Sequence, residues 1–126
     1  MRTKILLLLL LVGSILTSCS SSKSASGKMY KSNAHASYYA DKFNGRKTAS
    51  GEKFSNSKLT AAHRKIAFGT KVKVTNKANG KSVIVEINDR GPWVPGRDID
   101  LSKKAFMDIA DNKNHGALKV SIEIVN

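Results

Sequence analysis

In Asn88-Asp-Arg-Gly-Pro-Trp-Val-Pro-Gly-Arg-Asp-Ile-Asp-Leu-Ser102 the chain concentrates both prolines, its only tryptophan, two arginines and three of its nine acidic residues. A strand-like run precedes this stretch and a helix-like run follows it. An Asp at the end of an apolar strand, followed closely by Gly-Pro, lies where a strand opens into a surface loop. Such loops commonly carry binding and catalytic groups. The stretch is therefore predicted to be functional, although Asp89 and Asp100 are also typical of turn caps.

Alternation of apolar and polar residues predicts a β-hairpin directly before this stretch. Residues 70–76 alternate clearly, and Asn79-Gly80 supplies the positive-φ pair of a tight turn. The returning strand, residues 82–88, places its valines and Ile87 on one face. By the same parity Asp89 shares that face, and Arg90 should point away from it.

The remaining elements predict a mainly β fold. Short strands are expected over residues 36–40, 59–63, 98–101 and 118–125. Ser102 is a suitable N-cap for a helix over residues 103–110. Six short strands and one short helix, with no internal repeat, favour a small closed barrel, because closure removes exposed strand edges. The barrel domain is expected to span residues 34–126.

The first residues have the features of a lipoprotein export signal. A basic start is followed by an apolar run, residues 5–16, that is shorter than the roughly 20 residues needed to span a bilayer. Leu16-Thr-Ser-Cys19 closely resembles a bacterial lipobox. Residues 1–18 are therefore expected to be a signal peptide and residues 19–33 an acylated Cys with a flexible tether. An ordinary secretory signal with an incidental Cys is the alternative.

Cys19 is the only cysteine, so no internal disulfide is possible. Acyl chains on it would anchor the protein to a membrane without spanning it. An Asp directly after the acylated cysteine usually retains a lipoprotein in the inner membrane. This chain has Ser20 at that position, so in a host with two membranes we expect the protein to lie at the outer membrane, facing the periplasm. The expected location is the cell envelope.

The formal net charge is +13 at pH 7. In a cytosolic protein this balance would suggest nucleic acid, but export and the few aromatics among the basic residues argue against that partner. Outside the cytoplasm the polyanions are cell-wall glycans and anionic lipids, and a basic surface that only serves solubility is the alternative. The three histidines lack the short spacing of a metal site, so no metal or cofactor is expected.

Several motifs, in order and at matching spacing, closely resemble the rare lipoprotein A (RlpA) family from about residue 36 to 125. The resemblance implies a double-psi beta-barrel and an endolytic transglycosylase that acts on peptidoglycan glycan strands stripped of stem peptides. Longer members add a SPOR domain that binds such strands, and the resemblance does not extend to it. The motifs are Ala36-Ser-Tyr-Tyr39, Gly45-Arg-Lys-Thr-Ala-Ser-Gly-Glu52, Leu59-Thr-Ala-Ala-His63, Phe68-Gly-Thr70, Val74-Thr-Asn76, Asn79-Gly80, Asn88-Asp-Arg-Gly-Pro92 and Ile99-Asp-Leu-Ser102.

The resemblance places the residues tied to activity at Glu52, His63 and Asp89. In lytic cleavage the 6-hydroxyl of muramic acid replaces water, so one carboxyl can act first as acid and then as base. Our hypothesis is that Asp89 is this acid/base, that His63 orients it or the attacking hydroxyl, and that Glu52 binds substrate or adds a second charge. Asp100 is the rival acid, because expansins and some lytic enzymes carry an Asp before Leu at this place. Structural roles for His63, closing the barrel end, and for Glu52, as a surface carboxylate, stay open.

Aromatic and basic side chains are the candidates for substrate binding. Trp93 and Tyr39 could stack on sugar rings, although Tyr39 could equally be a packing residue of the barrel. Arg90 and Arg97 could pair with muramyl carboxylates, and Arg97 could equally lock the loop through a neighbouring Asp. A monomer is expected. The alternative function is a non-catalytic, expansin-like glycan-binding or wall-loosening module that uses the same cleft.

Overall fold

The computed structural model describes residues 27–112 and 114–126. The predicted signal peptide (residues 1–18), the predicted lipid attachment at Cys19 and the first part of the predicted tether lie outside the described residues. Within the described part, no helix has the length and apolar character needed to cross a bilayer.

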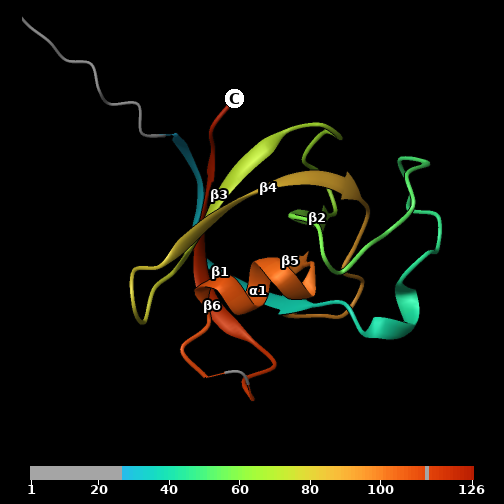
Figure 1. The fold of residues 1–126 in the computed structure, drawn as a ribbon. Helices are drawn as coiled ribbons and strands as arrows, with labels where there is room; N and C mark the ends of the chain where they lie inside the picture. The colour runs from blue at the N-terminus through green and yellow to red at the C-terminus, as the bar shows by residue number, and fades with distance from the viewer. Residues whose placement is uncertain (1–26, 113) are drawn as a thin grey trace, which may run out of the picture.

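Six strands form a closed barrel (Figure 1). Around the barrel the order is β1-β5-β2-β4-β3-β6, and β6 returns to pair with β1. The pairs β1/β5 and β2/β4 are parallel, and the other neighbours are antiparallel. The predicted mainly β, six-stranded barrel with one short helix is thus confirmed. The strands are β1 (Lys28–Tyr38), β2 (Thr60–His63), β3 (Lys71–Asn76), β4 (Ser82–Asp89), β5 (Ile99–Leu101) and β6 (Leu118–Ile124).

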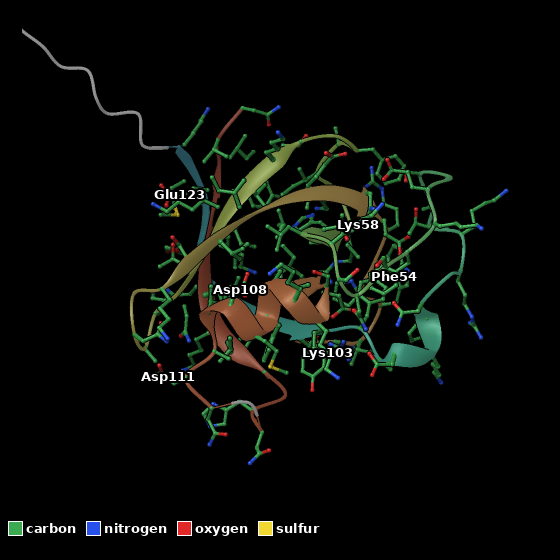
Figure 2. All side chains as sticks on the ribbon, viewed as in Figure 1. Phe54, Lys58, Lys103, Asp108, Asp111 and Glu123 are labelled. Carbon is green, nitrogen blue, oxygen red and sulfur yellow. The ribbon has the colours of Figure 1, made fainter. Side chains whose placement is uncertain are left out.

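The interior of the barrel is filled by the apolar faces that the alternation predicted, and α1 (Lys103–Ile109) packs against β4, β1 and β5. The side chain of Ser102 accepts a hydrogen bond from the Ala105 N–H, which confirms it as the N-cap of α1. The outer side of the helix carries charge, with Asp108 (Figure 2) 3.6 Å from Lys104. The largest fully buried apolar side chains are Phe106, Ile87, Ile99, Leu101, Ile109, Ile122, Val72, Val74, Val85 and Val120.

The predicted boundary between tether and domain was wrong. Strand β1 begins at Lys28, not near Ala34, and its first half pairs with β6 through two register shifts. Residues 28–33 are exposed and mostly polar, so they show no alternation from which a strand could be predicted. Their backbone pairs with β6 and extends the contact between the first and last strands.

A register shift at the end of β4 sets the direction of the functional side chains. Ala61 lies opposite Ile87, but the next residue, Ala62, lies opposite Asp89, so Asn88 is the extra residue of a β-bulge. Asn88 is buried at 4% exposure, whereas Asp89 is half-buried. The predicted parity of Asp89 with the core face was therefore wrong, because the bulge interrupts the alternation just before it.

Candidate active site

A cleft of about 570 Å³ lies where the ends of β1 and β4 approach β5. Three segments line it: the end of β1 with the 3-10 helix Asp41–Phe43, the loop before β2, and the stretch between β4 and β5 that was predicted to be functional. Its lining residues are Tyr38, Tyr39, Ala40, Phe43, Arg46, Lys47, Thr48, Phe54, Asp89, Arg90, Gly91, Pro92, Trp93, Val94, Arg97 and Asp100.

Asp89 is held in this cleft by three donors. Its Oδ1 accepts the backbone N–H groups of Ala49 at 2.8 Å and Arg90 at 2.9 Å, and its Oδ2 accepts the Tyr39 hydroxyl at 2.5 Å. The Tyr39 ring is stacked on Phe54 with centroids 4.1 Å apart, and Phe54 lies on the loop before β2 (Figure 2). Burial, reinforced by the hydrogen bond to Asp89, raises the pKa of Tyr39. Tyr39 therefore remains a protonated donor at neutral pH.

Asp100, the rival acid, lines the same cleft but has different partners. Its Oδ1 accepts the Ser37 hydroxyl and lies 2.6 Å from Arg97 Nη2 in an ion pair. The alternative in which Arg97 locks the loop through a neighbouring Asp is thus observed. Asp89, in contrast, forms no ion pair within the described ranges.

His63 does not line the cleft. It is 5% exposed, its Nδ1 accepts the N–H groups of Lys65 at 3.0 Å and Ile66 at 3.1 Å, and the Tyr30 ring packs edge-on with centroids 5.2 Å apart. Burial, with the positive charge of Arg64, lowers the pKa of His63 to about 4. His63 is therefore neutral at pH 7 and organises the turn after β2.

Glu52 lies on a second cleft, of about 420 Å³, bordered also by Lys53, Lys58 and Glu86. It is exposed, and its Oε1 accepts a hydrogen bond from the bulged Asn88 at 3.1 Å. Of the three residues predicted to be catalytic, only Asp89 lines the first cleft. The catalytic roles of Glu52 and His63 stay predictions, and neither side chain is among the hydrogen-bond donors to Asp89 in the described residues.

Arg90 connects His63 to the cleft through the backbone. Its guanidinium lies 3.9 Å from the centre of the Phe68 ring and donates to the carbonyls of His63 at 3.2 Å and Ile66 at 2.9 Å. Its own N–H binds Asp89. Arg90 thus links the turn after β2 to the end of β4, and its guanidinium is engaged by the protein itself.

The loop between β4 and β5 is anchored by Arg64, the residue directly after β2, which was not predicted from sequence to have a functional role. Arg64 Nη1 donates to the carbonyls of Pro92 at 2.8 Å and Arg97 at 2.6 Å, and so holds both ends of the loop. Between these ends Trp93 is 73% exposed at the rim of the cleft. Nothing in the local sequence marks Arg64 for this role, because both carbonyls are distant along the chain.

Arg46 and Lys47 also line the cleft, and neither was predicted from sequence to bind substrate. The sequence feature that could have identified them is their position within the family motif from Gly45 to Glu52. No group of three or more His, Cys, Asp or Glu side chains in the described parts of the chain could hold a metal ion.

A family model described as "Lytic transglycolase" matches residues 31–122, which include most of the barrel and every residue that lines the cleft. The chain belongs to the lytic transglycolase family. The expected relationship to RlpA is confirmed by its relatives. It is 53% identical over 98 residues to the probable endolytic peptidoglycan transglycosylase RlpA of Treponema pallidum, covering 78% of this chain and 30% of that protein.

A second relative is the endolytic peptidoglycan transglycosylase RlpA of Rickettsia bellii, which is 47% identical over 111 residues. That match covers 79% of this chain and 48% of the relative. The chain therefore spans less than half the length of these two curated relatives.

Solved structures with the same fold include Streptomyces papain inhibitor, with a TM-score of 0.61 and 23% identity over 77% of this chain and 96% of that one. The apo expansin of Clavibacter michiganensis has a TM-score of 0.60 and 22% identity over 77% of this chain and 51% of that one. At these identities the likeness concerns the fold. Together with the family match, it confirms the predicted double-psi beta-barrel.

Proposed function

We propose that this protein is an endolytic lytic transglycosylase that cleaves peptidoglycan glycan strands lacking stem peptides and leaves 1,6-anhydro-muramyl ends. The observation that carries the proposal is Asp89, a carboxylate without an ion pair among the described residues, held by three hydrogen bonds in the first cleft. Membership of the lytic transglycolase family and the activity in the names of the relatives support it.

The two oxygens of Asp89 have different chemical capacities. Oδ1 is bound by two backbone N–H groups, which donate but do not exchange a proton in catalysis. Oδ2 faces the Tyr39 hydroxyl, which can both donate and accept. We therefore assign the transferable proton to Oδ2, which in its protonated form can still accept the Tyr39 hydrogen bond while its own proton is available to the glycosidic oxygen.

In the proposed reaction, Asp89 first donates the Oδ2 proton to the glycosidic oxygen as the bond to the anomeric carbon breaks. The ionised carboxylate then accepts the proton of the muramic acid 6-hydroxyl as that oxygen bonds to the same carbon. The carboxyl group ends in its starting state. No water is consumed, because the 6-hydroxyl supplies the oxygen that bonds to the anomeric carbon. Trp93 supplies an exposed aromatic face for a sugar ring at the rim.

The roles of the other predicted residues follow from their positions. Asp100 and Arg97 form a neutral pair that shapes the cleft beside Asp89. His63 acts through the turn that Arg90 connects to Asp89, and Glu52 fixes the bulged Asn88. Tyr39 is a positioning group for Asp89 in addition to its predicted contact with substrate.

The deciding experiment treats the full chain with peptide-free glycan strands and, separately, with intact sacculi, and analyses released products by mass spectrometry. We expect anhydro-muramyl ends from the peptide-free strands and their loss in Asp89→Asn. Asp100→Asn is the matched carboxylate variant and should retain measurable cleavage. Full activity of Asp89→Asn with loss in Asp100→Asn would move the acid/base role to Asp100. Binding without any product would favour the expansin-like, non-catalytic module.

We also propose that the protein lies in the cell envelope, anchored by lipid on Cys19. In a host with two membranes we propose the outer membrane. We propose that the protein is a monomer. The lipobox-like Leu16-Thr-Ser-Cys19 supports the anchor. Replacing Cys19 with Ser should move the protein from the membrane to the soluble fraction. Retention of the variant in the membrane fraction would contradict the anchor, and light scattering of the detergent-solubilised chain tests the monomer.

A further inference from the structure

The cleft is lined by four cationic side chains, but two of them are already engaged by the protein. Arg90 donates to two carbonyls and packs on Phe68, and Arg97 is paired with Asp100. The other two, Arg46 and Lys47, are exposed and form no ion pair or side-chain hydrogen bond within residues 27–112 and 114–126. These two charges are therefore available to a ligand in the cleft.

The backbone beneath these two side chains is fixed. The Arg46 N–H donates to Phe43 O at 3.1 Å, its carbonyl accepts the Phe54 N–H at 2.7 Å, and Lys47 forms a β-bridge with Lys53. The Arg46 guanidinium lies 5.2 Å from the centre of the Phe43 ring, which also lines the cleft. The charged groups thus extend from a rigid support and keep their hydrogen-bonding capacity.

A negatively charged ligand needs such cations here. An anionic group that enters the cleft loses part of its hydration, which costs free energy unless positive charge pairs with it. An arginine beside a lysine can bind one carboxylate through several charge-assisted hydrogen bonds. In peptidoglycan glycan, the lactyl group of muramic acid is such a carboxylate when no stem peptide is attached, and it is a neutral amide when a peptide is attached.

We infer that Arg46 and Lys47 form a subsite for the free lactyl carboxylate of a muramic acid residue, and that they select strands without stem peptides. The inference rests on the glycan substrate proposed above. It replaces Arg90 and Arg97, which were predicted from sequence to bind this carboxylate, by two residues whose charged groups are not engaged by other described residues.

The test measures equilibrium binding and cleavage of two forms of peptide-free strands, one with free lactyl carboxylates and one converted to the methylamide with carbodiimide and methylamine. For the unaltered full chain, amidation should weaken binding about tenfold, the range expected for loss of charge-assisted hydrogen bonds. The double variant Arg46→Gln, Lys47→Gln should bind both forms as weakly as the unaltered chain binds the amide. Its KM for the free-acid strands should rise by a similar factor while kcat stays within about twofold.

The matched control is Lys71→Gln, Lys81→Gln, which removes two exposed charges from the β3/β4 hairpin, away from the cleft. It should keep the unaltered preference for free-acid strands, which separates a subsite from general attraction to a basic protein. Circular dichroism checks that both variants fold. The inference is overturned if the Arg46, Lys47 double variant still prefers free-acid strands, or if it weakens binding of both forms equally.

Binding is measured independently of cleavage, so this inference and the proposed lytic activity can fail separately. If the unaltered chain binds free-acid strands preferentially through Arg46 and Lys47 but releases no product, the subsite stands and the lytic proposal falls. If cleavage yields anhydro ends with no dependence on the lactyl charge, the lytic proposal stands and the subsite falls.

Discussion

The Tyr39 hydroxyl lies 2.5 Å from Asp89 Oδ2, although the two residues are 50 positions apart in the chain. The barrel brings them together because Tyr39 follows β1 and Asp89 ends β4. Stacking on Phe54 fixes the tyrosine ring, and two backbone N–H groups fix the other carboxylate oxygen. The orientation of the proposed acid/base is thus determined by groups from three separate segments.

Removing this hydroxyl should impair turnover more than binding. Tyr39→Phe keeps the stacked ring but leaves Oδ2 without its donor, so we expect kcat to fall about 10- to 100-fold, as for loss of a hydrogen bond to a charged group. Tyr38→Phe is the matched control, since Tyr38 lines the same cleft but packs on Phe106. Equal losses in both variants would contradict a specific role for Tyr39.

The buried, neutral His63 should make the folded state less stable in mild acid. Its pKa is about 4 in the folded protein and about 6.5 in an unfolded chain. Between these values the unfolded chain binds more protons, so the free energy of unfolding decreases as pH falls from about 6.5 toward 4. The full effect is about 3 kcal/mol.

Urea unfolding at several pH values measures this effect. His63→Gln should flatten the dependence between pH 6.5 and 4, whatever its stability at pH 7, and the exposed His115→Gln serves as the matched histidine variant. An unaltered slope in His63→Gln would mean that another group causes it.

Arg64 should control the order of the loop that carries Trp93 and Arg97. Arg64→Met removes the two hydrogen bonds to Pro92 O and Arg97 O while keeping an unbranched apolar stem. We expect kcat/KM to fall about 3- to 10-fold, because a loop that is no longer held loses conformational entropy when substrate binding orders it. Limited proteolysis should detect faster cleavage within residues 93–97. The neighbouring exposed Lys65→Met provides the control, and identical proteolysis of the two variants would argue against the anchoring role.

Trp93 should contribute to substrate binding without contributing to stability. Its side chain is 73% exposed, so Trp93→Ala should change the free energy of unfolding by less than about 0.5 kcal/mol. Loss of a stacking surface should weaken glycan binding about 3- to 10-fold. Thermal unfolding and glycan titration of the same preparation test both statements. Unchanged affinity would remove Trp93 from the binding surface.

The sequence by itself determined the elements whose order is local. Alternating residues identified β3, β4 and β6, Asn79-Gly80 identified the hairpin, and Ser102 marked the start of α1. These features depend on side-chain periodicity and on backbone conformations that few residues adopt, so short segments suffice to predict them. The family motifs added the barrel type, because several motifs at fixed spacing are specific in combination.

Only the tertiary structure decided which functional side chains point into the cleft and which residues they contact. The bulge at Asn88 arises from the pairing of β4 with β2, and it turns Asp89 into the cleft while burying its neighbour. The partners of Arg90, Arg97 and His63 likewise depend on segments that meet only when the barrel closes. Strand residues 28–33 have no alternation of their own and are extended because β6 offers hydrogen-bond partners. Pairing and closure are long-range, and local periodicity carries no information about them.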